Sequence, residues 1–549
     1  MEVHDSRVLI LGGSGLVGLA IARQMLEYAP ARLAITALTE AEADRGVTTL
    51  SGESAAETEL VGHFGDVFVA EELKDLGRLT ILESGEKRQR FLDDLYGPLD
   101  RERLERFYLF RLFQEERPDI VIDCVNTATA IAYQNLFSSG EQLRAAIHSG
   151  DDLPDLVDRH LATVYLPQLI RHVHVLLQAL REGGTDFYLK VGTTGTGGMG
   201  LNVPFTHSEQ RPSNMLMAKA GVAGAHSHLL FLLARTPGAP AVKEIKPAAA
   251  IAWKGIGVGP ILRRGIPMER FDATEPVELA NAFDEGQNSW RKLDGCLEAV
   301  YLDAGENGFF SRDEFETIST LGMMELVTPE EIADAVIREV RGQTTGLDIV
   351  SALDGAAMGP TYRGGVLREL ALRRMEELEE QFGRRSVAFE FLGPPRLTKL
   401  LFEAHMLERL YSTLTGIIEL DPERTAQDTF ALIQEDEDLR VGILTAGIPI
   451  LTPGGDRVLR GPEVKVKPRE GQELTDGVVS RGWVDLRSSN WQTWRNRVCN
   501  YRQELSQAPR PDDGSISDLD VSGRSERIRP GALTAWILRT EDKGERLKR

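Results

Sequence analysis

A glycine-rich turn near the amino terminus constrains the fold of this chain more than any other feature. The segment begins with a short apolar run, Val8 to Leu11, which is typical of a buried strand. Gly12, Gly15 and Gly18 follow at three-residue spacing, and the next stretch carries apolar residues on one helical face. A strand, a glycine turn and a helix in this order predict a fold that binds a dinucleotide through its pyrophosphate.

Each glycine has a mechanical role in such a turn. Gly12 permits the tight turn, Gly15 lets the backbone approach a pyrophosphate, and Gly18 lets the helix pack closely on the strand. The first N–H groups of the helix are then available to an anion. The whole turn is therefore predicted to bind the cofactor, through Gly12, Gly13, Ser14, Gly15, Leu16, Val17 and Gly18.

The expected second strand, residues 33–38, ends without a charged side chain. An acidic residue at this tip would grip the ribose 2′-hydroxyl of NAD, and a basic one would grip the 2′-phosphate of NADP. Glu40 and Arg45 follow the tip and point to opposite answers. NAD and NADP both stay open as the cofactor.

Further cofactor-binding candidates follow the third and fourth expected strands. A carboxylate at Asp66, beside Val67, can accept a hydrogen bond from an adenine amino group, although Gly-Asp is also common turn chemistry. The fourth strand, residues 120–124, precedes three more candidates, which are Asn126, Thr127 and Ala128. Ligands of open α/β sheets lie outside the carboxyl ends of the strands, so we expect these residues in one site.

These segments resemble the extended short-chain dehydrogenase/reductase superfamily, which contains NAD(P)-dependent epimerases, dehydratases and reductases. The resemblance covers roughly the first 265 residues, with the matching segments in the family's order. They are GGSGLVG (12–18), GD (65–66), DIVIDCVNTA (119–128), LKVGTTGTGG (189–198), Lys219 and IKPAAAIAWKGIGVGP (245–260). The resemblance implies an α/β fold with a Rossmann-type doubly wound parallel sheet.

The resemblance also implies catalytic roles. In this family a Ser or Thr at the end of the fifth strand orients the substrate oxygen, and a tyrosine transfers the proton. A lysine one helical turn later holds the nicotinamide ribose and lowers the pKa of the tyrosine. On this chain, Thr193 or Thr194 takes the hydroxyl role and Lys219 the lysine role. Pro247, in the last matching segment, is a further cofactor-binding candidate.

The chain departs from the family at the tyrosine, where it has Met215. A thioether cannot donate a proton, and none of the ten tyrosines has a lysine at the family's spacing. His207 is the catalytic candidate in its place because histidine titrates near neutral pH, although a solvated loop histidine is the competing interpretation. Tyr188 and Glu209 are alternatives.

Three functions stay open. The favoured one is an NAD(P)-dependent oxidoreductase that acts on a carbonyl or alcohol of a fairly large substrate, with non-standard proton transfer. The second is a non-catalytic NAD(P)-binding sensor or scaffold, which Met215 supports. The third is an epimerase or dehydratase with tightly bound NAD. Retention of Lys219 and of the threonine-rich strand end favours an enzyme.

A chain of 549 residues is too long for one compact core. We expect an NAD(P)-binding Rossmann domain over residues 1–265, with helical insertions at about 67–116 and 131–158. A mostly helical substrate or cap region over 266–435 and a β-containing region over 436–549 complete the expected mixed α/β carboxyl-terminal part. A mobile linker is expected at about 506–530. The insertions could cap the site or form an interface, so we expect a homo-oligomer.

Composition narrows the partners. The net charge of -21 repels phosphate backbones, so the expected partners are the dinucleotide and a small-molecule substrate, not nucleic acid. Cys124, Cys296 and Cys499 are too dispersed for a disulfide framework or a zinc site, and no metal is expected. No apolar run reaches the roughly 18 residues of a membrane span, and the start is unlike a signal peptide. We expect a cytoplasmic protein.

Overall fold

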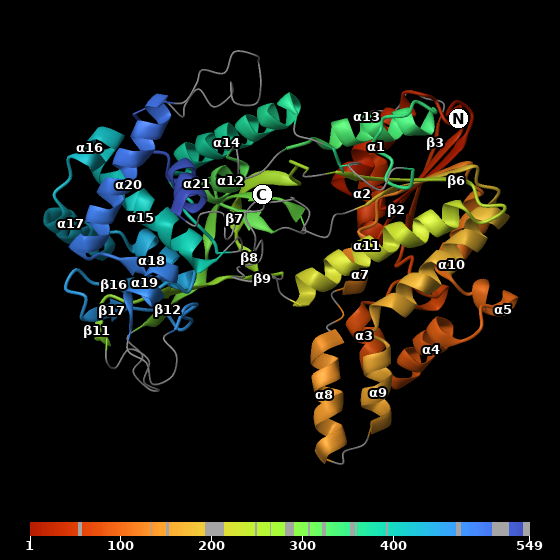
Figure 1. The fold of residues 1–549 in the computed structure, drawn as a ribbon, viewed down its shortest axis with the longest axis horizontal. Coiled ribbons are helices and arrows are strands. Elements are labelled where there is room, and N and C mark those ends of the chain that lie inside the picture. The colour runs from red at the N-terminus through yellow and green to blue at the C-terminus, as the bar shows by residue number, and fades with distance from the viewer. Residues whose placement is uncertain are drawn as a thin grey trace. The chain divides into compact units, whose positions relative to one another are not determined.

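The computed structural model divides the chain into two compact units, whose elements are labelled in Figure 1. Unit 1 comprises Met1–Gly198, Ser213–Ala250 and Val327–Gly359, and unit 2 comprises Met199–Pro212, Ile251–Leu326 and Pro360–Arg549. The structure describes residues 1–52, 58–132, 134, 136–149, 153–192, 214–247, 250–263, 265–279, 290–305, 308–320, 326–351, 357–358, 361–390, 394–467, 474–507 and 526–541.

Unit 1 is built on a parallel sheet, which confirms the Rossmann-type prediction. Across the described sheet the strand order is β15-β6-β5-β4-β1-β2-β3, and every neighbouring pair is parallel. The strands are β1 (Arg7–Leu11), β2 (Arg32–Ala37), β3 (Glu59–Phe64), β4 (Ile120–Asp123), β5 (Phe187–Val191), β6 (Ala241–Pro247) and β15 (Ala357–Met358). The chain reverses its direction of winding between β1 and β4, and ligands of such sheets bind at this switch point.

Helices cover both faces of the sheet, as a doubly wound fold requires (Figure 1). One face buries its apolar side chains against α1 (Leu16–Leu26), α2 (Glu40–Ser51) and α13 (Pro329–Val340). The opposite face packs on α6 (Tyr108–Glu116), α10 (Tyr165–Gly183) and α11 (Asn214–Ala234). This second face contains the helix that carries Lys219.

Helix α13 returns to unit 1 from far along the chain. Thr328 caps it, because the Thr328 hydroxyl accepts from the Glu331 N–H at 3.2 Å and the Glu331 carboxylate accepts from the Thr328 N–H at 2.9 Å. Ile332 and Val336 are fully buried in the core beside α1. The predicted domain boundaries place these residues in the substrate or cap region over 266–435, whereas the structure packs them in unit 1.

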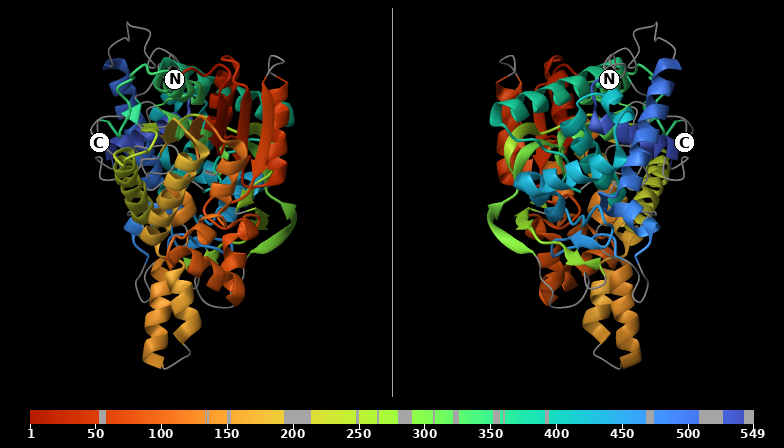
Figure 2. Two further views of the ribbon diagram at one scale, coloured as in Figure 1. Left: turned by 90° about the vertical axis from the view of Figure 1, so that its right-hand side faces the viewer. Right: turned by 90° about the vertical axis from the view of Figure 1, so that its left-hand side faces the viewer.

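Helical segments interrupt unit 1 at two places. Between β3 and β4 lie η1 (Glu71–Leu73), α3 (Arg78–Glu83), α4 (Gly85–Tyr96), α5 (Arg101–Leu104) and α6. Between β4 and α10 lie α7 (Thr127–Ala132), α8 (Leu136–Ser149) and α9 (Leu153–Leu161). Helices α8 and α9 pack side by side and project from the unit in both views of Figure 2.

Unit 2 has the mixed α/β content that was predicted for the carboxyl-terminal part. Its strands are β7 (Gly255–Pro260), β8 (Leu262–Arg263), β9 (Ile266–Pro267), β10 (Glu269–Asp272), β11 (Val277–Glu278), β12 (Arg291–Cys296), β13 (Glu298–Asp303), β14 (Phe309–Phe310), β16 (Ile450–Leu451), β17 (Arg457–Leu459) and β18 (Val484–Asp485). Its helices are α12 (Arg312–Ser319), α14 (Tyr362–Phe382), α15 (Pro395–Tyr411), α16 (Leu414–Ile418), α17 (Pro422–Glu435), α18 (Glu437–Thr445), α19 (Asp476–Gly482), α20 (Ser488–Gln507) and α21 (Pro530–Glu541).

Three tryptophans anchor the core of unit 2. Trp483, Trp491 and Trp494 are fully buried, and each indole N–H has an acceptor. The Trp494 indole donates to a carboxylate oxygen of Glu403 at 2.8 Å. Because they are fully buried, these side chains pack the helices of unit 2 together and do not line an open pocket.

Among the described helices, none has the combination of length and apolar character that a membrane crossing demands.

Candidate functional site

The glycine turn between β1 and α1 is held by close backbone packing. Gly12 has a φ of 69°, a conformation that glycine adopts without strain, and a Cβ there would lie 3.2 Å from the Val125 nitrogen. A Cβ on Gly13 would lie 2.7 Å from the Ile35 Cβ. A Cβ on Gly18 would lie 2.5 Å from the Gly12 oxygen, so at this position α1 packs against the turn itself.

Gly15 is different, because it is exposed. It is the N-cap of α1 with extended backbone, and a Cβ there would meet only the Gly12 oxygen, at 3.3 Å. No side chain caps the helix, and its first turn has no acidic residue. The first N–H groups of α1, those of Leu16, Val17 and Gly18, are therefore available to an anion at the switch point.

Asp66 and Val67 follow β3, as predicted, but Asp66 is engaged within its own turn. One carboxylate oxygen accepts from the Phe68 N–H at 2.9 Å, and the other lies 3.5 Å from Arg78 Nη2. The Val67 side chain is buried. The geometry is that of a turn aspartate, and contact with an adenine ring remains a prediction.

The turn after β4 lies directly beside the glycine turn, where Gly12 approaches Val125. Asn126 caps α7, because its side-chain oxygen accepts from the Thr129 N–H at 3.1 Å. The side chains of Thr127 and Ala128 are buried. The structure therefore brings this predicted segment to the glycine turn.

Helix α11 carries Lys219 on its buried face, where the residue is 6% exposed. Met215, one turn earlier, packs half-buried against the apolar cluster of Ala128, Ile131, Ala132, Leu169, Val222 and Ala223. Pro247 ends β6, next to β15. Thr193, Thr194 and His207 lie outside the described residues.

Tyr188 is removed as a replacement for the missing tyrosine. The residue is 0% exposed, and its hydroxyl donates to a carboxylate oxygen of Asp123 at 2.7 Å. Burial is the main cause that raises the pKa of Tyr188 well above its ordinary value, with the Asp123 charge adding to it. The phenol is locked inside the unit and cannot reach a substrate.

The sequence analysis missed a buried polar layer, which consists of Asp123, Tyr188, Lys190, Glu244 and Lys246. Strand register places Asp123 opposite Lys190, and Lys190 opposite Glu244. Each residue is 7% exposed or less. The signal was present, because β5 reads FYLKV, with Tyr188 and Lys190 two residues apart, and β6 reads AVKEIKP, with Glu244 and Lys246 two residues apart.

The polar layer continues into the helices that cover it. Lys246 Nζ lies 3.3 Å from a Glu244 carboxylate oxygen and donates to the Ala223 carbonyl of α11 at 3.2 Å. Burial raises the pKa of Glu244, whereas Lys246 and Ser227 lower it. The layer thus ties β4, β5 and β6 to the lysine helix.

Two buried histidines beside the layer predict acid sensitivity. Burial lowers the pKa of His172 from 6.5 to about 4 and lowers that of His226 well below its ordinary value. Protonation therefore favours the unfolded chain, and stability present above pH 6.5 is lost as the pH falls toward 4. At 1.36 kcal/mol per pKa unit, His172 alone contributes up to roughly 3 kcal/mol of this loss.

The thermal midpoint of unfolding, followed from pH 7 to pH 5, checks this prediction. We expect the midpoint to fall with pH and the slope to be smaller in His172→Gln. His228→Gln is the control, because His228 is exposed on α11. A flat wild-type profile, or a His172→Gln profile as steep as that of the wild type, would contradict it.

A possible metal grouping elsewhere in unit 1 is already occupied by cations. Among the described residues, His63, Glu115 and Glu116 have metal-ligand spacing. Arg32 donates twice to Glu116, at 2.7 and 2.8 Å, and His63 Nε2 lies 2.6 Å from it. Burial alone would raise the pKa of Glu116, but Arg32 and His63 lower it to about 2. The arrangement is a buried ion-pair cluster, and we assign no metal to it.

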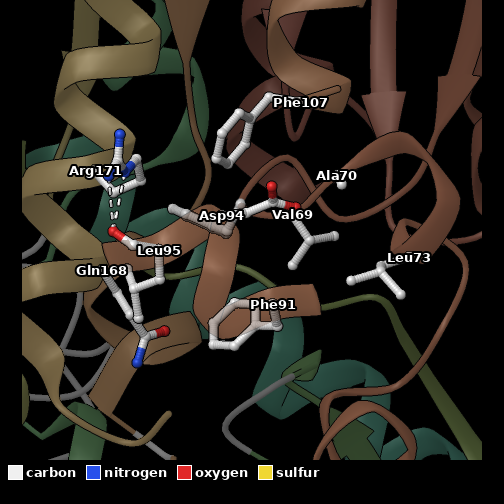
Figure 3. Close-up of a pocket in the computed structure, with 10 residues that line it drawn as sticks. Val69, Ala70, Leu73, Phe91, Asp94, Leu95, Phe107, Gln168 and Arg171 are labelled. Carbon is white, nitrogen blue, oxygen red and sulfur yellow. Dashed lines mark hydrogen bonds between the residues drawn. The ribbon is translucent and has the colours of Figure 1, made fainter. Parts of the chain in front are cut away.

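A small cavity between α4 and α10 does not serve as the substrate site. Its volume is about 20 Å³, which suits a single water molecule. Figure 3 shows Asp94 among apolar lining residues. Neither Asp94 oxygen has a hydrogen-bond partner, and the nearest arginine nitrogen, of Arg106, is 3.3 Å away.

Comparison with known families finds a match in the carboxyl-terminal half of the chain. Residues 269–542 match the family model of the beta-methylindole-3-pyruvate reductase C-terminal domain. The match includes most of unit 2 and the segment of unit 1 that contains α13. This half of the chain therefore resembles a domain that belongs to a reductase. No curated protein sequence matches the chain.

Solved structures similar to this chain include several short-chain dehydrogenases. One from Burkholderia cenocepacia in complex with NADP has 13% identity and a TM-score of 0.30, and the match covers 63% of this chain and 95% of that one. One from Mycobacterium ulcerans has 13% identity and a TM-score of 0.26, with 46% and 70% covered. The MalC reductase/Diels-Alderase from Malbranchea aurantiaca has 11% identity and a TM-score of 0.26, with 45% and 74% covered. At these TM-scores we base no argument on them, and the fold rests on the strand order itself.

Proposed function

We propose that this protein is an NAD(P)H-dependent reductase of a carbonyl group. The observation that carries the proposal is the uncapped amino terminus of α1, behind a glycine turn, at the switch point of a doubly wound parallel sheet. That arrangement suits a pyrophosphate. The reductase-type domain over residues 269–542 supports reduction as the chemistry.

The proposed cofactor contacts are those predicted from the sequence. The backbone of residues 12–18 would bind the pyrophosphate, Asp66 and Val67 would lie beside the adenine, and residues 126–128 with Pro247 would line the nicotinamide half. Lys219 would hold the nicotinamide ribose. The nicotinamide supplies a hydride, and Thr193 or Thr194 would orient the substrate oxygen that gains a proton.

A 2-oxo acid with an aromatic side chain is the proposed substrate class. The matching domain belongs to a reductase of beta-methylindole-3-pyruvate, which is such an acid. Proton transfer would be non-standard, because the Met215 thioether has no ionisable proton and the buried Tyr188 hydroxyl donates to Asp123. His207 is the proposed donor, since an imidazolium can release a proton near neutral pH.

The test follows the absorbance of NADH and NADPH in the presence of phenylpyruvate or indole-3-pyruvate. We expect oxidation of the cofactor with formation of the 2-hydroxy acid, and a lower rate in His207→Gln. Saturable cofactor binding without turnover of either acid would contradict the reductase proposal and favour a binding module.

We further propose that the enzyme prefers NADH to NADPH. The β2 tip carries Leu38, which is 65% exposed, and Thr39, whose N–H donates to the Glu42 carboxylate at 3.3 Å. The amino terminus of α2 therefore already holds a carboxylate, and no basic residue lies between Thr36 and Glu42. A ribose 2′-phosphate placed there would meet like charge, which is unfavourable.

The two dissociation constants test this preference. We expect NADH to bind about tenfold more tightly than NADPH, a difference of about 1.4 kcal/mol. Leu38→Arg supplies a cation at the β2 tip and should reduce or reverse the preference for NADH over NADPH. Leu38→Gln should leave the ratio of the two dissociation constants unchanged. Tighter binding of NADPH by the wild type would contradict the proposal.

A further inference from the structure

Lys190 is a lysine in the middle of a buried sheet. It lies on β5 and is 2% exposed. Its ammonium donates to an Asp123 carboxylate oxygen at 2.7 Å and to the Val125 carbonyl at 2.5 Å. Burial of an ion pair is costly, and well-packed apolar residues in its place are often as stable. Stability alone does not explain why a charge is kept here.

The partners of Lys190 show what it holds. The Val125 N–H donates to the same Asp123 oxygen at 2.9 Å, and the Thr127 N–H donates to the Val125 carbonyl at 2.8 Å. Tyr188 holds the second oxygen of Asp123. Both backbone polar groups of Val125 are thereby fixed, and Lys190 is the link between this turn and β5.

The fixed turn lies where the two halves of a dinucleotide meet. A Cβ on Gly12 would lie 3.2 Å from the Val125 nitrogen, so the β4–α7 turn touches the pyrophosphate-binding turn. In a doubly wound sheet β1 to β3 receive one mononucleotide half, and β4 to β6 receive the other. The adenosine half of the dinucleotide is therefore expected over β1 to β3, away from Lys190. The nicotinamide half is expected over β4 to β6, where Lys190 fixes the β4–α7 turn.

We propose that Lys190 is a positioning residue: by tying Asp123 to the Val125 carbonyl, it holds the β4–α7 turn in the shape that receives the nicotinamide half of the dinucleotide. The inference rests on the proposed function, because it requires a dinucleotide at the switch point. Tyr188 helps to hold the same turn, because its hydroxyl donates to the other oxygen of Asp123.

The experiment compares two ligands that share the adenosine half. NADH and ADP are titrated against the wild type and Lys190→Met, which keeps the side-chain length and removes the charge. We expect Lys190→Met to raise the dissociation constant for NADH by about tenfold, because the turn is no longer preorganised. The dissociation constant for ADP should stay within about twofold of the wild-type value. Tyr188→Phe removes one bond to Asp123 and should have a smaller effect of the same kind. It also provides the test should Lys190→Met fail to fold.

Lys243→Met is the matched control, because Lys243 lies on the neighbouring strand and pairs with Glu339 of α13 on the opposite face. Lys243→Met should leave the dissociation constants for NADH and ADP unchanged. Equal weakening of NADH and ADP in Lys190→Met would overturn the inference in favour of general damage to the site. Unchanged NADH binding in a folded Lys190→Met and Tyr188→Phe would also overturn it. A folded wild type that binds neither ADP nor NADH would instead contradict the proposed function, and the inference with it.

Discussion

Gly15→Leu should abolish dinucleotide binding and leave the protein folded. The backbone at Gly15 is extended, with a φ of -75°, and a Cβ would meet only the Gly12 oxygen, at 3.3 Å. Because Gly15 is exposed and its backbone conformation suits any residue, a small shift of the Gly12 oxygen would accommodate a side chain here. That side chain would occupy the space in front of the first turn of α1, where the pyrophosphate is expected. We expect the dissociation constant for NADH to rise by at least about 100-fold, or about 2.7 kcal/mol.

The neighbouring glycine separates loss of binding from loss of folding. Gly18→Leu would place a Cβ 2.5 Å from the Gly12 oxygen and should lower the thermal midpoint as well. Gly85→Leu is the neutral control, since a Cβ at Gly85 meets nothing within 4 Å. Nicotinamide fluorescence and thermal unfolding of the three variants give the answer. Wild-type affinity in Gly15→Leu would refute the placement of the pyrophosphate.

Lys219→Met should cause the second large loss, in turnover more than in binding. The resemblance gives Lys219 the nicotinamide ribose, and the structure places it on the buried face of α11, one turn from the Ala223 carbonyl that Lys246 binds. Methionine keeps the aliphatic length and removes the ammonium. With an accepted 2-oxo acid we expect kcat to fall by about 100-fold, within the range for groups that assist proton transfer.

Lys292→Met is the matched control for this variant, because Lys292 is a surface residue of unit 2 whose side chain is 55% exposed. It should have wild-type kcat and KM. If Lys219→Met also turns over at the wild-type rate, the lysine has no part in the reaction and the catalytic half of the resemblance fails.

The sequence predicted the elements of unit 1 well because their signals are local. The apolar run before Gly12, the glycine spacing at 12, 15 and 18 and the apolar strand at residues 120–123 each depend on a few neighbouring residues. The site was harder to predict. Thr193, Thr194 and His207 lie outside the described residues, and their roles stay predictions.

Long-range pairing limited the rest. Helix α13 packs against the sheet of unit 1, far from it in the sequence. Its own residues predict an apolar face but do not determine which apolar surface that face contacts. The buried polar layer was legible as alternation in FYLKV. However, the pairing of Lys190 with Asp123 follows from strand register, which joins residues far apart in the chain. The sequence allows Tyr188 as a proton donor, and only the direction of its side chain toward Asp123 excludes it.

Titration of the purified wild-type protein with NADH, followed by nicotinamide fluorescence after removal of any cofactor already bound, tests the central claim most directly. We expect saturable binding of NADH at one site, which is lost in Gly15→Leu and retained in Gly85→Leu. A folded, empty protein that binds neither NADH nor NADPH would contradict it, because the uncapped helix at the switch point would then have no dinucleotide to hold.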